Sequence, residues 1–277
     1  MPVATTADLV ARARAARRGL AAFNVITLEH AEAAAAAGEA AGLPVVLQVS
    51  ENAVRFHGGD PAPVLAACAA VARGCAVPVS LHLDHVEERE LLHAGAEAGV
   101  SSMMFDASKL PYAQNVRATA NAVAWAHERG IWLEAELGEI GGKDGAHAPG
   151  VRTDPDDAAA YTEATGVDAL AVAVGSSHAM TERTARLDHD LIARLRERVP
   201  VPLVLHGSSG VPDDELRQAV KSGMVKINVG TALNVAYTSA VREHLARRPS
   251  AVDPRRYLTA ARTAMAEAAE HILRVLG

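Results

Sequence analysis

Short runs of β-branched and other apolar residues alternate along the chain with longer Ala-, Glu- and Arg-rich stretches. The short runs have the length and composition of buried strands, and the longer stretches are typical of helices. Eight strands are predicted, at residues 21–26, 44–49, 79–83, 101–105, 132–137, 169–174, 201–205 and 225–229. Glycines that can end a helix recur shortly before these strands, at Gly42, Gly99, Gly130, Gly166 and Gly223.

Eight β-then-α units without a linker predict one α/β domain, a (β/α)8 TIM barrel that spans residues 1–277 and ends in a helical tail. A doubly wound open sheet is the competing fold. That sheet would favour a glycine-rich dinucleotide-binding turn after its first strand, and the segment AFNVITLEH contains no glycine. The glycine-rich stretch 138–154 is the longest expected loop and is interpreted as a lid.

The composition supports a large core and argues against several kinds of partner. Hydrophobic residues make up 49% of the 277 residues and charged residues 22%. A net charge of −6 without a long Lys/Arg run argues against nucleic-acid binding, and the basic cluster at 12–18 is interpreted as a solvated helix face. No apolar run is long enough to span a membrane, and no signal peptide is recognised. Cys68 and Cys75 are expected to be buried free thiols in a cytoplasmic protein.

Polar residues follow nearly every predicted strand, at the end of the barrel where active sites of this fold lie. They are Asn24, Ser50, Asp84, His85, Asp106, Glu136, His178, His206, Asn228 and Thr231. The three histidines follow strands three, six and seven, and three neutral imidazoles with one open position are typical of catalytic zinc. Any one of them alone is more simply a loop histidine with local hydrogen bonds. Their convergence on one end of the barrel favours a metal centre.

The segment LHLDH ends the third strand and contains two further candidates. Asp84, next to a candidate metal ligand, is suited to general acid–base catalysis, and its alternative role is to support a histidine. His82 shares the strand parity of Asp84 and is interpreted as a packed residue of the barrel interior. His85 has the opposite parity, at a point where the chain is expected to turn.

Two loops rich in small residues suggest a phosphate site. The run GSSG at 207–210 follows strand seven, and the run NVGT at 228–231 follows strand eight; each precedes a predicted helix. Small residues expose backbone N–H groups to an anion, and barrels often bind phosphate at this pair of loops. A GSSG run by itself is a common turn, so its place in the barrel carries the prediction.

The segments LHLDH, WLEAELGEIGG, AVGSSHAM, LVLHGSSGVPDDELRQAVKSGMVKINVGT and DPRRYLTAARTAM resemble the class II, metal-dependent ketose-bisphosphate aldolases. This family includes fructose-bisphosphate and tagatose-bisphosphate aldolases, and the resemblance covers almost the whole chain. It implies a (β/α)8 barrel with one catalytic Zn²⁺ per subunit, assembled as a homodimer or homotetramer. It further implies a small-molecule sugar phosphate as substrate, cleaved reversibly to dihydroxyacetone phosphate and an aldehyde.

The resemblance also implies roles for individual residues. His85, His178 and His206 would hold zinc, with Glu136 near the metal as a support or an alternative ligand. Asp84 would exchange the proton of the C4 hydroxyl, and Asn228 would hold the enediolate. The remaining substrate and phosphate contacts would come from Asn24, Ser50, Gly207, Ser209, Gly230 and Thr231. A monovalent cation, Na⁺ or K⁺, is expected at nearby carbonyls.

Several positions depart from the family pattern. The family usually has a glutamate after the double glycine of the lid; this chain has Lys143 and Asp144 there, so Asp144 is the candidate for proton exchange on the ketone side. Asn234 stands where the family often has a lysine or arginine for the phosphate of the aldehyde half. Arg183, Arg255 and Arg262 are the candidates to replace that cation, from this chain or a neighbouring subunit.

The leading hypothesis is a zinc-dependent aldolase acting on fructose 1,6-bisphosphate. Tagatose bisphosphate and 6-phospho-5-dehydro-2-deoxygluconate are close alternative substrates. A metal-dependent hydrolase would need a His-x-His pair on strand one, which AFNVI lacks, and a non-catalytic phosphosugar-binding barrel would not need Asp84 beside three histidines. A Schiff-base mechanism would need a desolvated lysine on a strand, whereas the metal-dependent mechanism needs none. Lys226 is the only lysine in a predicted strand, and it is disfavoured as a nucleophile.

Overall fold

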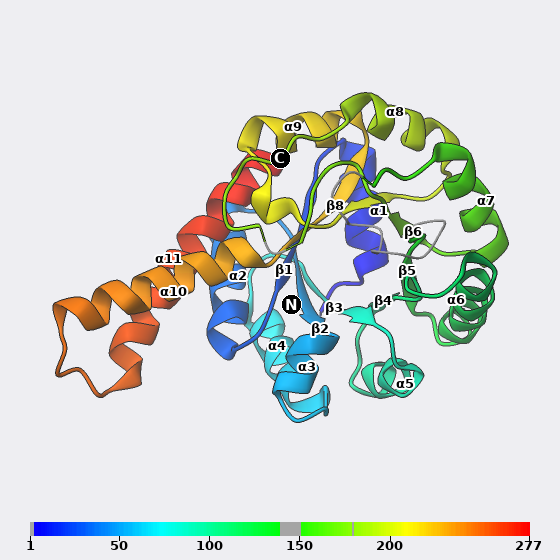
Figure 1. Ribbon diagram of the computed structural model, residues 1–277. Coiled ribbons are helices and arrows are strands. Elements are labelled where there is room, and N and C mark those ends of the chain that lie inside the picture. Colours follow the sequence, from blue (N-terminus) through cyan, green and yellow to red (C-terminus); the bar gives the residue numbers. More distant parts are fainter. Residues whose placement is uncertain (1–2, 139–150, 179) are drawn as a thin grey trace.

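Eight parallel strands close into a barrel in chain order, and β1 pairs with both β2 and β8 in the computed structural model (Figure 1). The structure describes residues 3–138, 151–178 and 180–277. The strands are β1 (Leu20–Asn24), β2 (Val45–Ser50), β3 (Val79–Val86), β4 (Ser102–Phe105), β5 (Trp132–Glu136), β6 (Ala169–Ala171), β7 (Leu203–Leu205) and β8 (Met224–Val229). The predicted (β/α)8 TIM barrel is confirmed, and every predicted strand is present. Most of the predicted lid lies outside the described residues.

Helices surround the barrel and close one end of it. They are α1 (Thr6–Ala16), α2 (Leu28–Ala41), α3 (Glu51–Phe56), α4 (Ala62–Gly74), α5 (Arg89–Glu97), α6 (Tyr112–His127), α7 (Pro155–Thr165), α8 (His189–Arg198), α9 (Asp213–Ser222), α10 (Thr231–Arg247) and α11 (Pro254–Leu276), with a 3₁₀ turn η1 (Ser208–Gly210). Helix α1 contacts β1, β3 and β8. Helices α10 and α11 form a hairpin that projects beyond the barrel wall (Figure 1).

Local signals explain where several helices begin and end. Asp154 caps the N-terminus of α7 by accepting hydrogen bonds from two backbone N–H groups, and Pro155 follows it. Gly42 and Gly166 end α2 and α7 with φ angles of +67° and +71°, a left-handed conformation that costs glycine little. These are two of the glycines that the sequence pattern marks as helix ends.

The strands divide their side chains between an apolar outer face and a polar interior. In β3, Leu81 and Leu83 belong to the core between strands and helices, whereas the alternate residues Ser80, His82 and Asp84 are buried polar groups. Because buried polar groups must be hydrogen-bonded, this interior dictates contacts between strands. The prediction for His82 agrees with the structure: the side chain is fully buried, and its Nδ1 lies 2.7 Å from the Ser102 Oγ.

Five cations line a second cavity, at the end of the barrel covered by α1. They are Arg14, Arg17, Arg18, Arg196 and Lys221. All five are exposed, and they lie at the C-terminal ends of α1, α8 and α9. Positive charge at a helix C-terminus interacts favourably with the helix dipole, which accounts for the cluster as a solvated surface.

No helix within the described residues is long and apolar enough to cross a membrane.

Candidate active site

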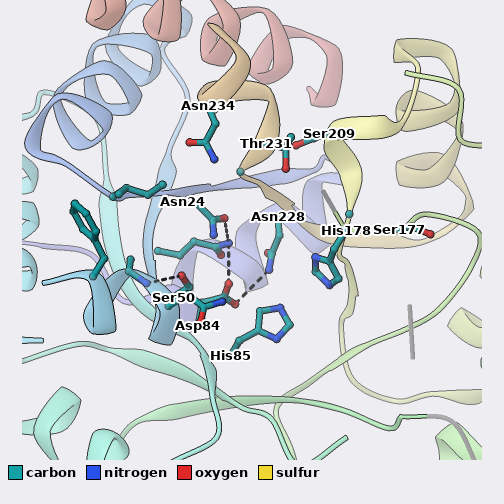
Figure 2. Close-up of a pocket in the computed structure, with 17 residues that line it drawn as sticks. Asn24, Ser50, Asp84, His85, Ser177, His178, Ser209, Asn228, Thr231 and Asn234 are labelled. Carbon is teal, nitrogen blue, oxygen red and sulfur yellow. Dashed lines mark hydrogen bonds between the residues drawn. The ribbon is translucent and has the colours of Figure 1, made fainter. Parts of the chain in front are cut away.

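A cavity of about 450 Å³ opens at the C-terminal ends of the strands (Figure 2). Its walls come from β1, β2, β3 and α3, and from the loops that follow β6, β7 and β8. The predicted site residues that line it are Asn24, Ser50, Asp84, His85, His178, Gly207, Ser209, Asn228, Gly230 and Thr231. Within the described residues, no lysine or arginine lines it.

Two histidines that line this cavity, His85 and His178, form a cluster with the buried His206. One ring nitrogen from each of His85, His178 and His206 lies within 4.8 Å of the others. His85 and His178 lie next to each other (Figure 2), with ring centroids 5.3 Å apart, and His206 is fully buried. The structure therefore brings together the three histidines that the sequence predicts, in an arrangement that could hold a metal ion.

An unusual backbone conformation places His85 in the cluster. Its φ angle is +49°, in the left-handed region that non-glycine residues seldom adopt, and the pairing of β3 with β4 shifts register between Leu83 and Val86. In a regular strand Asp84 and His85 would point to opposite faces. The left-handed residue breaks this alternation, so both side chains line the same cavity.

Carboxylates fix the orientation of two of the imidazole rings. The Nδ1 of His85 lies 2.8 Å from Oδ2 of Asp106, and the Nε2 of His206 lies 3.0 Å from Oε1 of Glu134. A carboxylate at one ring nitrogen is the usual partner of a metal-binding histidine, so Nε2 of His85 and Nδ1 of His206 are the nitrogens that could serve as ligand atoms.

Negative charge around His206 favours a cation. The Oε2 of Glu136 lies 3.2 Å from the Nδ1 of His206, the ring nitrogen that does not contact Glu134. Burial alone would lower the pKa of His206, but hydrogen bonds to Glu134 and Glu136 outweigh burial and raise this pKa to about 10. A divalent ion fits the same surroundings, because the donor set combines three imidazoles with a nearby carboxylate.

Asp84 lies beside the histidine cluster and faces two amides. Its Oδ2 accepts a hydrogen bond of 3.4 Å from Gln48, and its Oδ1 accepts one of 3.5 Å from the Nδ2 of Asn228. Burial would raise the pKa of Asp84, but the nearby charges of His85 and Lys226 outweigh burial and lower it. The ionised carboxylate is therefore the form present at neutral pH, and it is able to accept a proton.

The anion-binding prediction falls on two adjacent loops. Gly207 has a φ angle of +66° and begins the turn η1, and Thr231 is the first residue of the 17-residue helix α10. Ser209 joins the loops, because its Oγ accepts a hydrogen bond of 3.0 Å from the backbone N–H of Ala232. The N-terminus of α10 presents backbone N–H groups and a positive dipole end to the cavity, a suitable setting for a phosphate.

Comparison with known proteins decides the family. The family model described as class-II fructose-bisphosphate aldolase matches residues 4–277. The chain belongs to the class II fructose-bisphosphate aldolase family. A fructose-bisphosphate aldolase from Geobacillus stearothermophilus is 39% identical over 246 residues, which cover 88% of this chain and 86% of that protein. The resemblance seen in the sequence motifs is thereby confirmed.

Solved structures agree with this class II aldolase assignment. The YdjI aldolase from Escherichia coli K12 superposes with a TM-score of 0.86 at 32% identity, covering 99% of this chain and 97% of that one. The fructose-bisphosphate aldolase from Campylobacter jejuni has a TM-score of 0.82 at 23% identity, covering 99% and 95% of the two chains, and supports the fold.

Among the described residues of this class II aldolase, no lysine or arginine lines the cavity beside Asn234. Asn234 lines it, and the Oδ1 of Asn234 lies 3.3 Å from the Nε2 of His30. Phe56, with 70% of its surface exposed, also lines the cavity. Each of the three arginines suggested from the sequence is paired elsewhere, with an acidic residue: Arg183 with Asp213, Arg255 with Asp253, Arg262 with Glu32. Asp144, the proposed replacement for the lid glutamate, lies outside the described residues.

Four residues of the site were not assigned a role from the sequence. The sequence marks Asp106 only as a strand-end residue and Lys226 only as a disfavoured Schiff-base lysine, and it gives Gln48 and Glu134 no role. The alternation of side chains along a strand could have indicated three of them. Each lies two residues before a predicted site residue on the same strand and therefore points to the same face; they are Gln48, Glu134 and Lys226. Gln48 also donates a hydrogen bond of 2.6 Å to the Oδ1 of Asn24, so it links β1 to Asp84.

Replacing Gly207 by alanine should weaken substrate binding in this aldolase. A Cβ at this position would lie 2.5 Å from the carbonyl oxygen of Ser177, and the left-handed backbone adds strain of about 1–2 kcal/mol. We expect a rise of about tenfold or more in KM, equivalent to about 1.4 kcal/mol, measured by steady-state kinetics. Gly130 is the matched control, because its φ angle is +67° and nothing lies within 4 Å of an added Cβ. An unchanged KM in Gly207→Ala would contradict this account of the loop.

Proposed function

We propose that this class II aldolase is zinc-dependent and reversibly cleaves fructose 1,6-bisphosphate to dihydroxyacetone phosphate and glyceraldehyde 3-phosphate. The observation that carries the proposal is the meeting of the histidine triad with Asp84 and with two loops of small residues that line the cavity. The same cavity disfavours the hydrolase and the non-catalytic alternatives, because each would leave part of this set without a purpose.

We propose one Zn²⁺ per subunit at His85, His178 and His206. Bound there, the ion would supply Lewis-acid chemistry for the negative charge that develops on the C2 oxygen of the ketone. Three imidazoles favour zinc over harder cations. The Oε2 of Glu136 lies 3.2 Å from the Nδ1 of His206. This distance is consistent with Glu136 either holding the His206 ring in place or acting as an alternative metal ligand.

Asp84 is the proposed general base of cleavage. It accepts the proton of the C4 hydroxyl, the C4 oxygen forms a carbonyl, and the C3–C4 bond breaks with its electron pair passing to the ketone fragment. Asn228 then donates a hydrogen bond from its amide to the enediolate. Its Nδ2, 3.5 Å from Oδ1 of Asp84, supports this role. Asp144 is proposed for proton exchange at the ketone side.

The phosphate of the ketone half is proposed to bind at the two loops. The backbone and hydroxyl groups of Gly207, Ser209, Gly230 and Thr231 line that wall of the cavity. A monovalent cation, Na⁺ or K⁺, is proposed at neighbouring carbonyls. Ser50, which caps α3 by accepting from the N–H of Ala53, and Asn24 are proposed to bind the substrate near its carbonyl.

We propose that the single barrel domain, with its α10–α11 tail, assembles as a homodimer or homotetramer. The hairpin carries exposed apolar residues at Val235, Leu245 and Val252. The lack of a cation among the described residues of the cavity supports a contribution from a second subunit to the phosphate of the aldehyde half. The buried free thiols Cys68 and Cys75 support a reducing, cytoplasmic location.

Release of dihydroxyacetone phosphate from fructose 1,6-bisphosphate tests the function. We expect release in a coupled assay, loss of release after chelation, and recovery with added zinc. Tagatose bisphosphate and 6-phospho-5-dehydro-2-deoxygluconate, assayed on the same sample, rank the substrates. A folded, zinc-loaded protein that releases nothing from fructose 1,6-bisphosphate would refute the proposed substrate.

A further inference from the structure

A fully buried ammonium lies below the floor of the cavity. Lys226, on β8, has no exposed surface, although lysine is rarely buried in proteins. Its Nζ donates a hydrogen bond of 2.9 Å to Oε2 of Glu134 and one of 2.8 Å to Oδ1 of Asn228. Lys226 does not line the cavity, so it does not contact a substrate bound there.

Through Glu134, the ammonium is connected to the metal-binding ring. The Oε1 of Glu134 lies 3.0 Å from the Nε2 of His206, while its other oxygen binds Lys226. A continuous chain of contacts thus runs from Asn228 through Lys226 and Glu134 to His206. Its two ends are the amide proposed to hold the enediolate and a histidine proposed to hold zinc.

The contact with Lys226 decides which end of the Asn228 amide faces the cavity. The Oδ1 of Asn228 accepts from the ammonium, so the Nδ2 is turned toward Asp84 (Figure 2). An amide oxygen and an amide nitrogen are nearly equal in size, and their hydrogen-bond partners select the orientation. Without the ammonium, the amide could rotate and present its oxygen, which repels an enediolate.

We propose that Lys226 is a positioning residue of the aldolase reaction, one that orients the amide of Asn228 and, through Glu134, the ring of His206. This inference rests on the proposed function for its catalytic part. Stability does not account for the pair, because a buried ion pair contributes little net stability and apolar replacements are often neutral or stabilising. A nucleophilic role is disfavoured, because Nζ is bound to Glu134 and Asn228 inside the barrel.

The test removes the buried pair without leaving a lone charge. In the double variant Lys226→Met/Glu134→Gln both members of the pair become neutral, and Lys221→Met, at an exposed lysine, is the matched control. We expect the double variant to fold with a Tm near that of the wild type. Its kcat should fall by about a hundredfold, as when one donor to an anionic transition state is lost, with a smaller change in KM. Lys221→Met should keep the wild-type values.

Two further measurements separate positioning from folding. Exchange of the C3 proton of dihydroxyacetone phosphate with D₂O, followed by NMR, reports enediolate formation without the aldehyde, and it should slow in parallel with kcat. At saturating zinc, combining Lys226→Met/Glu134→Gln with Asn228→Ala should give losses in kcat that multiply only in part, because part of the effect of Lys226 passes through Asn228. Fully multiplicative losses, or wild-type kcat in the folded double variant, would overturn the proposal.

Zinc affinity tests the second connection without any substrate. Competition with a chromophoric chelator should show affinity about 10–100-fold weaker in Lys226→Met/Glu134→Gln, because the carboxylate that orients His206 is lost. An unchanged zinc affinity would refute the connection through Glu134, whatever the substrate proves to be. A wild-type protein that binds zinc but neither cleaves fructose 1,6-bisphosphate nor exchanges the C3 proton would refute the proposed function and, with it, the catalytic role of Lys226.

Discussion

Replacing Asp84 by asparagine should lower kcat for cleavage of fructose 1,6-bisphosphate by about a thousandfold, within the range for loss of a general base. Asparagine has nearly the same shape and keeps a side-chain oxygen to accept from Gln48, but it cannot take the C4 hydroxyl proton at neutral pH. KM should change little, because the loops proposed to bind phosphate are untouched. Steady-state kinetics with the coupled assay measure both parameters.

Zinc content distinguishes the two roles considered for Asp84. A general base can be removed while one zinc per subunit is retained, whereas a residue that only supports a metal ligand would lose zinc and activity together. Asp106→Asn is the matched control, because Asp106 is the carboxylate that binds Nδ1 of His85. That variant should bind zinc about 10–100-fold more weakly and regain activity at saturating zinc. If the kcat of Asp84→Asn stays within tenfold of the wild-type kcat, another residue must be the general base.

Replacing His85 by asparagine should remove both the metal and the activity. Asparagine tolerates the left-handed backbone at this position better than most residues, so the barrel should still fold. Its amide is a poor zinc ligand compared with imidazole, and two histidines cannot complete the site. We expect zinc to fall from about one to near zero per subunit after dialysis, measured by metal analysis, and kcat to fall by about a thousandfold or more.

The control for this variant is a histidine outside the triad. His93 lies on α5, where its ring stacks on Trp125, and His93→Asn should keep zinc and activity. Full zinc occupancy in His85→Asn would contradict the assignment of His85 as a ligand. The same result would favour Glu136, which lies beside the Nδ1 of His206, as the third metal ligand.

Much of the fold and part of the site could be predicted from local patterns in the sequence. The alternation of apolar runs and helical stretches is repeated eight times, so errors of a few residues at strand ends did not alter the topology. The histidines were recognisable because the fold places strand ends together. The turn expected at His85 is instead an irregularity inside β3, which continues to Val86; its left-handed φ and the register shift depend on the partner strand β4 and have no local signal.

The polar contacts inside the barrel also depend on the tertiary structure. Parity indicates that Gln48, Glu134 and Lys226 point inward, but it does not say which of them meet. Lys226 and Glu134 are brought together from β8 and β5, strands that are not neighbours in the barrel. The stagger of the strands around the axis fixes such contacts, and stagger has no local sequence signal.

The order in which the barrel strands occur in the chain has a consequence during synthesis on the ribosome. The candidate metal ligands lie on β3 and after β6 and β7, and Asn228 lies on β8. The second edge of β1 stays unpaired until β8 has been synthesised. A nascent polypeptide that has emerged only through β6 therefore has one of its three histidines, His85, and an open sheet. Pairings between such distant segments form slowly and late. Zinc would consequently be acquired by finished chains, and an abortive translation product ending before residue 224 would be inert.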